Sequence, residues 1–200
     1  PTARDRRGAA TDPVVAVAAG HVAFLNNSGG GSSYGKYVVV EHPDPSLGTI
    51  PRRDGGADPA VVYTLYAHLA DIRFGIRPGQ SVEPGDVLGT MGATSNTRPP
   101  IPLSRSHLHW EIGLMLHGRF DARAREQKAS NPFGNHNGGN LYGLDPLDFY
   151  AAHTRDPGLT MAINHKGSVG LAEKARAAGV TRFIQASSCS TYGAGGDEMR

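Results

Sequence analysis

The sequence lacks a pair of cysteines that could form a disulfide, a cluster of basic residues for binding nucleic acid, and an apolar segment long enough to span a membrane. It has one cysteine, Cys189, so no disulfide can form within the chain. The formal net charge is only +2, and the basic residues are scattered, so we expect no nucleic-acid partner. The longest apolar stretch, Pro13 to Leu25, contains Gly20 and His21 and is too short to span a bilayer. The fold must therefore depend on its hydrophobic core.

The composition is that of a globular protein with many turns. Apolar residues make up 38% of the chain and charged residues 19%, which excludes a disordered chain. The 27 glycines and 14 prolines indicate frequent turns and short strands. No signal peptide is visible, and the chain starts with Pro1 instead of methionine, so we expect that its beginning is missing or processed away.

Up to about residue 153 the pattern is that of β-strands joined by long polar loops. Two Pro-Gly pairs, Pro78-Gly79 and Pro84-Gly85, predict turns that make the chain double back. Runs rich in β-branched residues predict the strands. These runs are Val14 to Ala18, His21 to Leu25, Tyr37 to His42, Val61 to Ala67 and His107 to Leu114. The predicted loops are residues 26–34, 43–59, 91–106 and 118–144.

The last part of the chain has a different character. Ser168 to Ala178 has helical spacing and ends at Gly179, and Val180 to Ala186 is typical of a buried strand. One helix and one strand form half of an α/β unit, and a lone strand of this kind has no sheet to join. We therefore predict a mainly β domain at residues 1–153 and a short α/β fragment at 154–200.

Three histidines carry the chemistry that we expect. His107 and His109 are two residues apart on a predicted strand, which places both on one face, with Leu108 and Trp110 directed into the core. His68 follows a predicted strand, where a β scaffold presents side chains to a cleft. Taken singly, each histidine is as readily a structural or solvated residue. Their joint order and spacing is specific.

That order is Tyr-Ala-His-Leu at 66–69, the two Pro-Gly turns, and His-Leu-His-Trp-Glu-Ile at 107–112. Over roughly residues 1–150 it resembles the lysostaphin/LytM-type (M23) metallopeptidases. The resemblance implies a small antiparallel β barrel-like sandwich related to lipoyl domains. It also implies a zinc enzyme that cleaves peptide bonds of bacterial peptidoglycan.

The same resemblance implies the roles of individual residues. The family's zinc ligands are a His, an Asp four residues later, and the second His of a His-x-His. Carried over, Asp5 and His109 would bind zinc, while Pro1 stands where the first histidine is expected. His68 and His107 would orient and activate the water and stabilise the oxyanion. Asp12 is a poorer alternative to Asp5 because it directly precedes the predicted strand.

Glu111 alternates onto the face of His107 and His109. There it is either an orienting partner of an imidazole or a solvated carboxylate.

The tail resembles a piece of an extended short-chain dehydrogenase, the epimerase/dehydratase type, from about residue 156. Its Ala-Ser-Ser-Cys-Ser-Thr-Tyr-Gly segment at 186–193 places Ser188 where that family has a serine that polarises the substrate hydroxyl. The glycine-rich dinucleotide loop and the Tyr-x-x-x-Lys are absent from the sequence, so we expect no oxidoreductase activity. We interpret the tail as a fragment joined to an unrelated domain.

Together these observations predict a monomeric cell-wall endopeptidase that requires zinc. By family resemblance it would be secreted or held in the bacterial cell envelope, with peptidoglycan peptide as its substrate. The alternative is a degenerate LytM-like module that binds wall peptide, or regulates another hydrolase, without catalysis. Proline at position 1 favours that alternative, and retention of the three histidines favours the enzyme.

Overall fold

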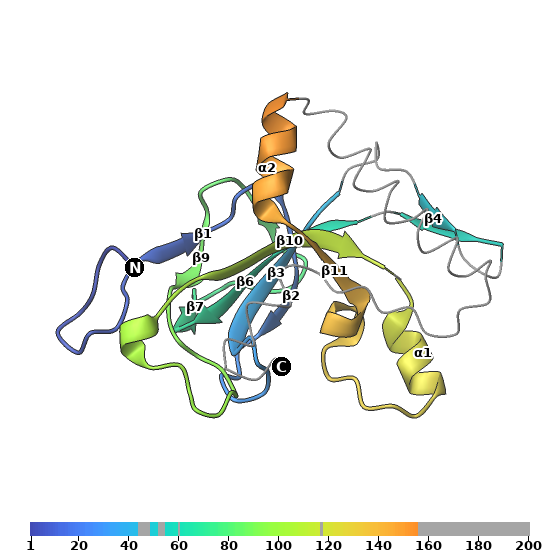
Figure 1. Ribbon diagram of the computed structural model, residues 1–200. Coiled ribbons are helices and arrows are strands. Elements are labelled where there is room, and N and C mark those ends of the chain that lie inside the picture. Colours follow the sequence, from blue (N-terminus) through green and yellow to red (C-terminus); the bar gives the residue numbers. More distant parts are fainter. Residues whose placement is uncertain (44–48, 52–54, 60, 117, 156–200) are drawn as a thin grey trace, which may run out of the picture. The chain divides into compact units, whose positions relative to one another are not determined.

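The structure, a computed structural model, describes residues 1–43, 49–51, 55–59, 61–116 and 118–155 (Figure 1). Its contacts divide the chain into two units. The first combines Pro1–Pro43 with Tyr63–Glu111, and the second combines Asp44–Val62 with Ile112–Arg200. The helix and strand predicted within residues 168–186 lie outside the described residues.

The first unit consists of short strands, as predicted. One sheet has the order β1-β9-β7, and its two pairings are antiparallel. In the other sheet β2 pairs antiparallel with β3 and with β8, and β6 and β10 follow beyond β3. In the described part of the chain both sheets stay open instead of closing into a barrel. The strands are β1 (Pro13–Val15), β2 (Gly20–Asn26), β3 (Lys36–His42), β6 (Val62–Leu69), β7 (Asp71–Ile72), β8 (Ser81–Val82), β9 (Val87–Thr90) and β10 (His109–Met115).

The second unit contains short elements in the two stretches predicted as loops. Strands β4 (Thr49–Pro51) and β5 (Ala57–Pro59) form a pair, and the end of β10 pairs with β11 (Leu141–Leu144). The helices are α1 (Phe120–Glu126) and α2 (Pro146–Arg155), with 3-10 turns at Gly134–His136 and Gly138–Asn140. Helix α1 buries no residue, so its sequence has no apolar face from which to predict it. Among the described residues, no helix combines the length and apolarity needed to cross a bilayer.

The core of the first unit is built from valines, leucines and a tyrosine. Leu108 and Trp110 pack against it, which confirms their predicted inward direction. All eight residues of β6 are buried, so this strand is covered on both faces. The buried cluster comprises Val14, Ala16, Val22, Val38, Val40, Tyr66, Leu69, Val82 and Leu88.

Both Pro-Gly pairs form the predicted turns. The N–H of Gln80 donates to Arg77 O at 3.2 Å, and the N–H of Asp86 donates to Glu83 O at 3.0 Å. The turn glycines have positive φ, 82° at Gly79 and 92° at Gly85. Proline followed by a left-handed glycine is the sequence of a type II turn, which explains why these turns were readable from sequence.

Gly35 is the glycine whose substitution should destabilise the first unit most clearly. Its φ is +62°, and a Cβ there would lie 2.1 Å from the carbonyl oxygen of Thr94. Gly35→Ala should therefore lower the free energy of unfolding by more than the roughly 1 kcal/mol cost of a left-handed alanine. Gly8→Ala is the matched control, because Gly8 has φ +79° with no atom within 4 Å of its Cβ position. Equal losses for the two variants in urea unfolding would contradict the prediction.

His42 should make stability depend on pH. Burial lowers its pKa, a nearby His21 lowers it further, and the Ala19 carbonyl and Glu41 partly offset this. The unfolded chain then binds the proton more readily, so stability is lost as pH falls below the unfolded histidine value of about 6.5. Replacing His42 by Gln should flatten this acid-side slope in unfolding curves measured from pH 8 to 5. An unchanged slope would rule out His42 as its source.

Candidate active site

His68 lies at the end of β6, where the backbone leaves the strand. Its φ is +60°, an unusual conformation for a residue other than glycine. Its N–H donates to Tyr34 O at 2.9 Å, and its ring Nδ1 is 2.8 Å from Thr94 O. The residue is 7% exposed. Bonds from both backbone and ring therefore hold a strained residue in one orientation, as is common at functional sites.

The segment Gly92–Thr94 positions two of the histidines. Gly92 forms an isolated antiparallel bridge with His107, whose N–H donates to Gly92 O at 3.1 Å. A Cβ at Gly92 would lie 2.3 Å from Ala70 N and 2.8 Å from His68 O, so only glycine permits this close approach. The Thr94 hydroxyl donates to Leu69 O at 2.7 Å and accepts from Lys36 N at 2.9 Å. The same short segment thus contacts the backbone of His68 and of His107.

His107 does not lie in a strand as predicted, because β10 begins only at His109. His107 instead forms an isolated bridge with Gly92. The three rings nevertheless come together. The ring centroids of His68 and His107 are 4.8 Å apart, and those of His68 and His109 are 5.6 Å apart. His107 is exposed, while His68 is buried.

His109 and Glu111 do share one face of β10, as strand alternation predicted. His109 Nε2 is 2.8 Å from Glu111 Oε1, and the carboxylate is buried. Tyr34 packs edge-on against the His109 ring, with centroids 5.3 Å apart. Sequence reasoning missed Tyr34, Tyr63 and Thr94, because no motif connects these residues to the histidines.

The hydrogen bonds of the rings define their neutral tautomers. A carbonyl oxygen can only accept, so Nδ1 carries the proton in His68, bonded to Thr94 O, and in His107, bonded to Arg105 O at 2.9 Å. Nε2 is therefore the basic nitrogen of both rings. Burial lowers the pKa of His68, the neighbouring His107 and His109 lower it further, and the Thr94 carbonyl opposes the shift. His68 is thus a neutral base at pH 7.

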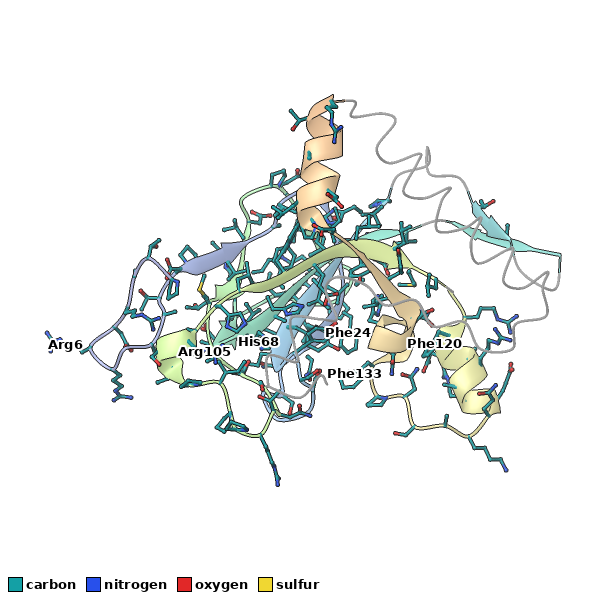
Figure 2. The ribbon with its side chains drawn as sticks, viewed as in Figure 1. Arg6, Phe24, His68, Arg105, Phe120 and Phe133 are labelled. Carbon is teal, nitrogen blue, oxygen red and sulfur yellow. The ribbon has the colours of Figure 1, made fainter. Side chains whose placement is uncertain are left out.

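Asp5, the predicted second metal ligand, lies in an exposed loop of the same unit. Its Oδ1 accepts from Arg7 N at 2.8 Å and from Ala9 N at 2.9 Å, so the carboxylate caps its own turn. Arg4 ties this loop to the segment before His107 by donating to the carbonyls of Leu103 and Ser104 at 2.8 and 2.9 Å. Figure 2 shows Arg6 at the outer end of the loop, directed away from His68. The described contacts of Asp5 are therefore with its own loop.

The described residues do not fit a complete zinc site. Within the described ranges, which include all four predicted site residues, no three His, Cys, Asp or Glu side chains are grouped so that they could hold a metal ion. Zinc in a catalytic site normally takes three protein ligands. Pro1 stands where the first zinc ligand was expected, and Oδ1 of Asp5, the second predicted ligand, is hydrogen-bonded within its own turn. We therefore derive no catalytic step through a metal.

The site thus joins a buried imidazole, an exposed imidazole and a carboxylate-bound imidazole. Comparison with known protein families matches residues 3–122 to peptidase family M23. The chain belongs to this family, which confirms the resemblance seen in the sequence. A second match, to the NAD dependent epimerase/dehydratase family, covers residues 147–200 and agrees with the resemblance of the tail. No curated protein matches the chain.

Several solved structures are similar to this chain. One is a zinc containing peptidase from Vibrio cholerae (26% identity, 51% of this chain, 23% of that chain, TM-score 0.35). Another is the catalytic domain of the prophage-encoded M23 protein EnpA from Enterococcus faecalis (19% identity, 52% and 60%, TM-score 0.35). The lysostaphin catalytic domain from Staphylococcus simulans is 19% identical, with 71% and 72% covered and a TM-score of 0.39. The chain spans less than two thirds of the length of the first two.

The Thr94 hydroxyl should be required for the local structure around His68. Thr94→Val removes the bonds to Leu69 O and Lys36 N, which should lower the free energy of unfolding by about 1–3 kcal/mol. Thr94→Ser keeps the hydroxyl and serves as the control. Urea unfolding of the three chains measures the difference, and equal stabilities of the Val and Ser variants would show that the hydroxyl contributes nothing.

Proposed function

We propose that this chain is the peptidase module of a zinc-dependent endopeptidase that cleaves peptide bonds of bacterial peptidoglycan. The observation that carries the proposal is the convergence of His68, His107 and His109 in a chain of family M23. The ring centroids of His107 and His109 lie 4.8 and 5.6 Å from that of His68, and each ring is oriented by a hydrogen bond. A purely structural role does not require such a cluster.

His68 and His107 are assigned the proton transfers. His68 is neutral and buried, with its basic Nε2 available for accepting a proton from water. His107 is exposed, so it can exchange protons with solvent and donate to a developing oxyanion. An imidazole has one nitrogen that can accept a proton and one that can donate, which suits both roles. In this proposal Asp5 and His109 bind the zinc, and their ligation needs a direct test because the described conformation leaves Asp5 in its own turn.

A second candidate is a module that binds wall peptide without catalysis. Two observations favour it, the proline at position 1 and the bonding of the Asp5 carboxylate within its loop. The two candidates share a substrate, peptidoglycan peptide, and a location, the cell envelope or its exterior. They also share the proposed division into a domain at 1–153 and a fragment at 154–200, and the proposal that the chain is monomeric. They differ in zinc content and turnover.

The decisive experiment measures bound zinc and peptidoglycan hydrolysis on the full chain. The peptidase proposal expects bound zinc, hydrolysis that a chelator abolishes, and loss of zinc in His109→Ala. Replacing His68 or His107 by Ala should retain zinc and lower the rate by about 10²–10⁴-fold. His21→Ala is the control, since His21 is paired with Glu41 at the surface.

Absence of both zinc and hydrolysis would overturn the peptidase proposal. Sedimentation of the same chain with purified peptidoglycan would then support the binding module. A chain that neither binds zinc, hydrolyses nor sediments would contradict both candidates.

A further inference from the structure

Glu111 is a buried carboxylate with three hydrogen-bond donors around it. It is 4% exposed. Its Oε1 accepts from the Tyr34 hydroxyl at 2.7 Å and faces His109 Nε2 at 2.8 Å. Its Oε2 accepts from the Tyr63 hydroxyl at 3.2 Å. A carboxylate withdrawn this far from water is stable only if its oxygens are satisfied, and here each oxygen has a donor.

These donors determine how Glu111 acts on His109. Tyr34 precedes β3 and Tyr63 lies in β6, so two separate segments of the chain donate hydrogen bonds to the carboxylate. With both hydroxyls donating to it, the carboxylate acts as an acceptor, and His109 Nε2 must then carry a proton. His109 is thereby the Nε2–H tautomer, the opposite of His68 and His107. Its basic nitrogen is Nδ1.

We propose that Glu111 is a positioning residue that holds His109 as the Nε2–H tautomer and so makes Nδ1 the nitrogen available to a ligand. The tautomer itself does not depend on the proposed function. Only the consequence for zinc affinity and hydrolysis does, because it assumes that His109 binds the metal. Partners of this kind orient a ligating imidazole and raise its basicity.

The test reads the protonation of His109 by ¹⁵N NMR on the full, metal-free chain at one neutral pH. In the wild type, a ring proton bonded to Nε2 should be visible and protected from exchange with water. Its assignment is confirmed by its loss in His109→Gln. Glu111→Leu, which removes the acceptor, should abolish the protected signal. Glu111→Gln should retain it, because the amide oxygen can still accept.

Glu41→Leu is the matched control. It removes a carboxylate 3.2 Å from His21 Nε2, but that pair is solvent-accessible, with side-chain exposures of 41% and 18%. The His109 signal should be unchanged in this variant. If the loss of any Glu–His pair affected the His109 signal, that signal would change in Glu41→Leu as well as in Glu111→Leu.

Two results would overturn the proposal. One is a wild-type His109 that carries its proton on Nδ1 and none on Nε2. This result is obtained on the wild-type chain, so it does not depend on whether Glu111→Leu folds. The other is a protected Nε2–H signal that persists in folded Glu111→Leu. A merely structural Glu111 would change stability without moving this signal.

Titration with zinc alone separates this inference from the proposed function. If the wild type binds zinc, Glu111→Leu should bind it about 10–100-fold more weakly. Equal zinc affinity in the two chains would overturn the consequence drawn for the metal. If the wild type binds no zinc, the zinc-peptidase proposal fails, while the tautomer result for His109 stands or falls by NMR alone.

Discussion

The close approach of the Gly92–Thr94 segment to the end of β6 is the constraint on which the site depends. Gly92 touches the backbone at His68 and Ala70 and bridges to His107, and only a residue without Cβ can do both. Two residues later, Thr94 accepts the ring proton of His68. His109 follows at the start of β10, beside β6, with its ring centroid 5.6 Å from that of His68.

The three histidines of the cluster differ in their exposure to solvent. His68 is buried and its pKa is lowered, His109 is partly buried against a carboxylate, and His107 faces solvent. Different hydrogen-bond partners give the rings different basic nitrogens, since carbonyls hold Nδ1–H in two of them and Glu111 holds the third. Groups with distinct protonation and exposure are suited to distinct steps of one reaction.

Membership in family M23 favours a metallopeptidase, whereas the residues predicted to bind zinc do not form a metal site among the described residues. The family match covers the histidine cluster and most of the first unit. Proline at position 1 cannot coordinate a metal through its side chain, and Asp5 Oδ1 accepts from N–H groups of its own loop. That loop is nevertheless fastened by Arg4 just ahead of His107. Zinc binding by Asp5 therefore stays a prediction.

The amino-acid sequence by itself determined the β class, the two Pro-Gly turns and the three histidines. Local patterns carry each of these, namely β-branched runs, proline followed by left-handed glycine, and a spaced motif. Helix α1 had no such pattern, since it buries no residue and shows no apolar face.

Only the tertiary structure decided the environment of the histidines. It placed Tyr34, Tyr63 and Thr94 beside them, removed His107 from the strand, and bonded the Asp5 carboxylate within its own loop. These contacts join residues far apart in sequence, so they follow from chain packing instead of from local pattern.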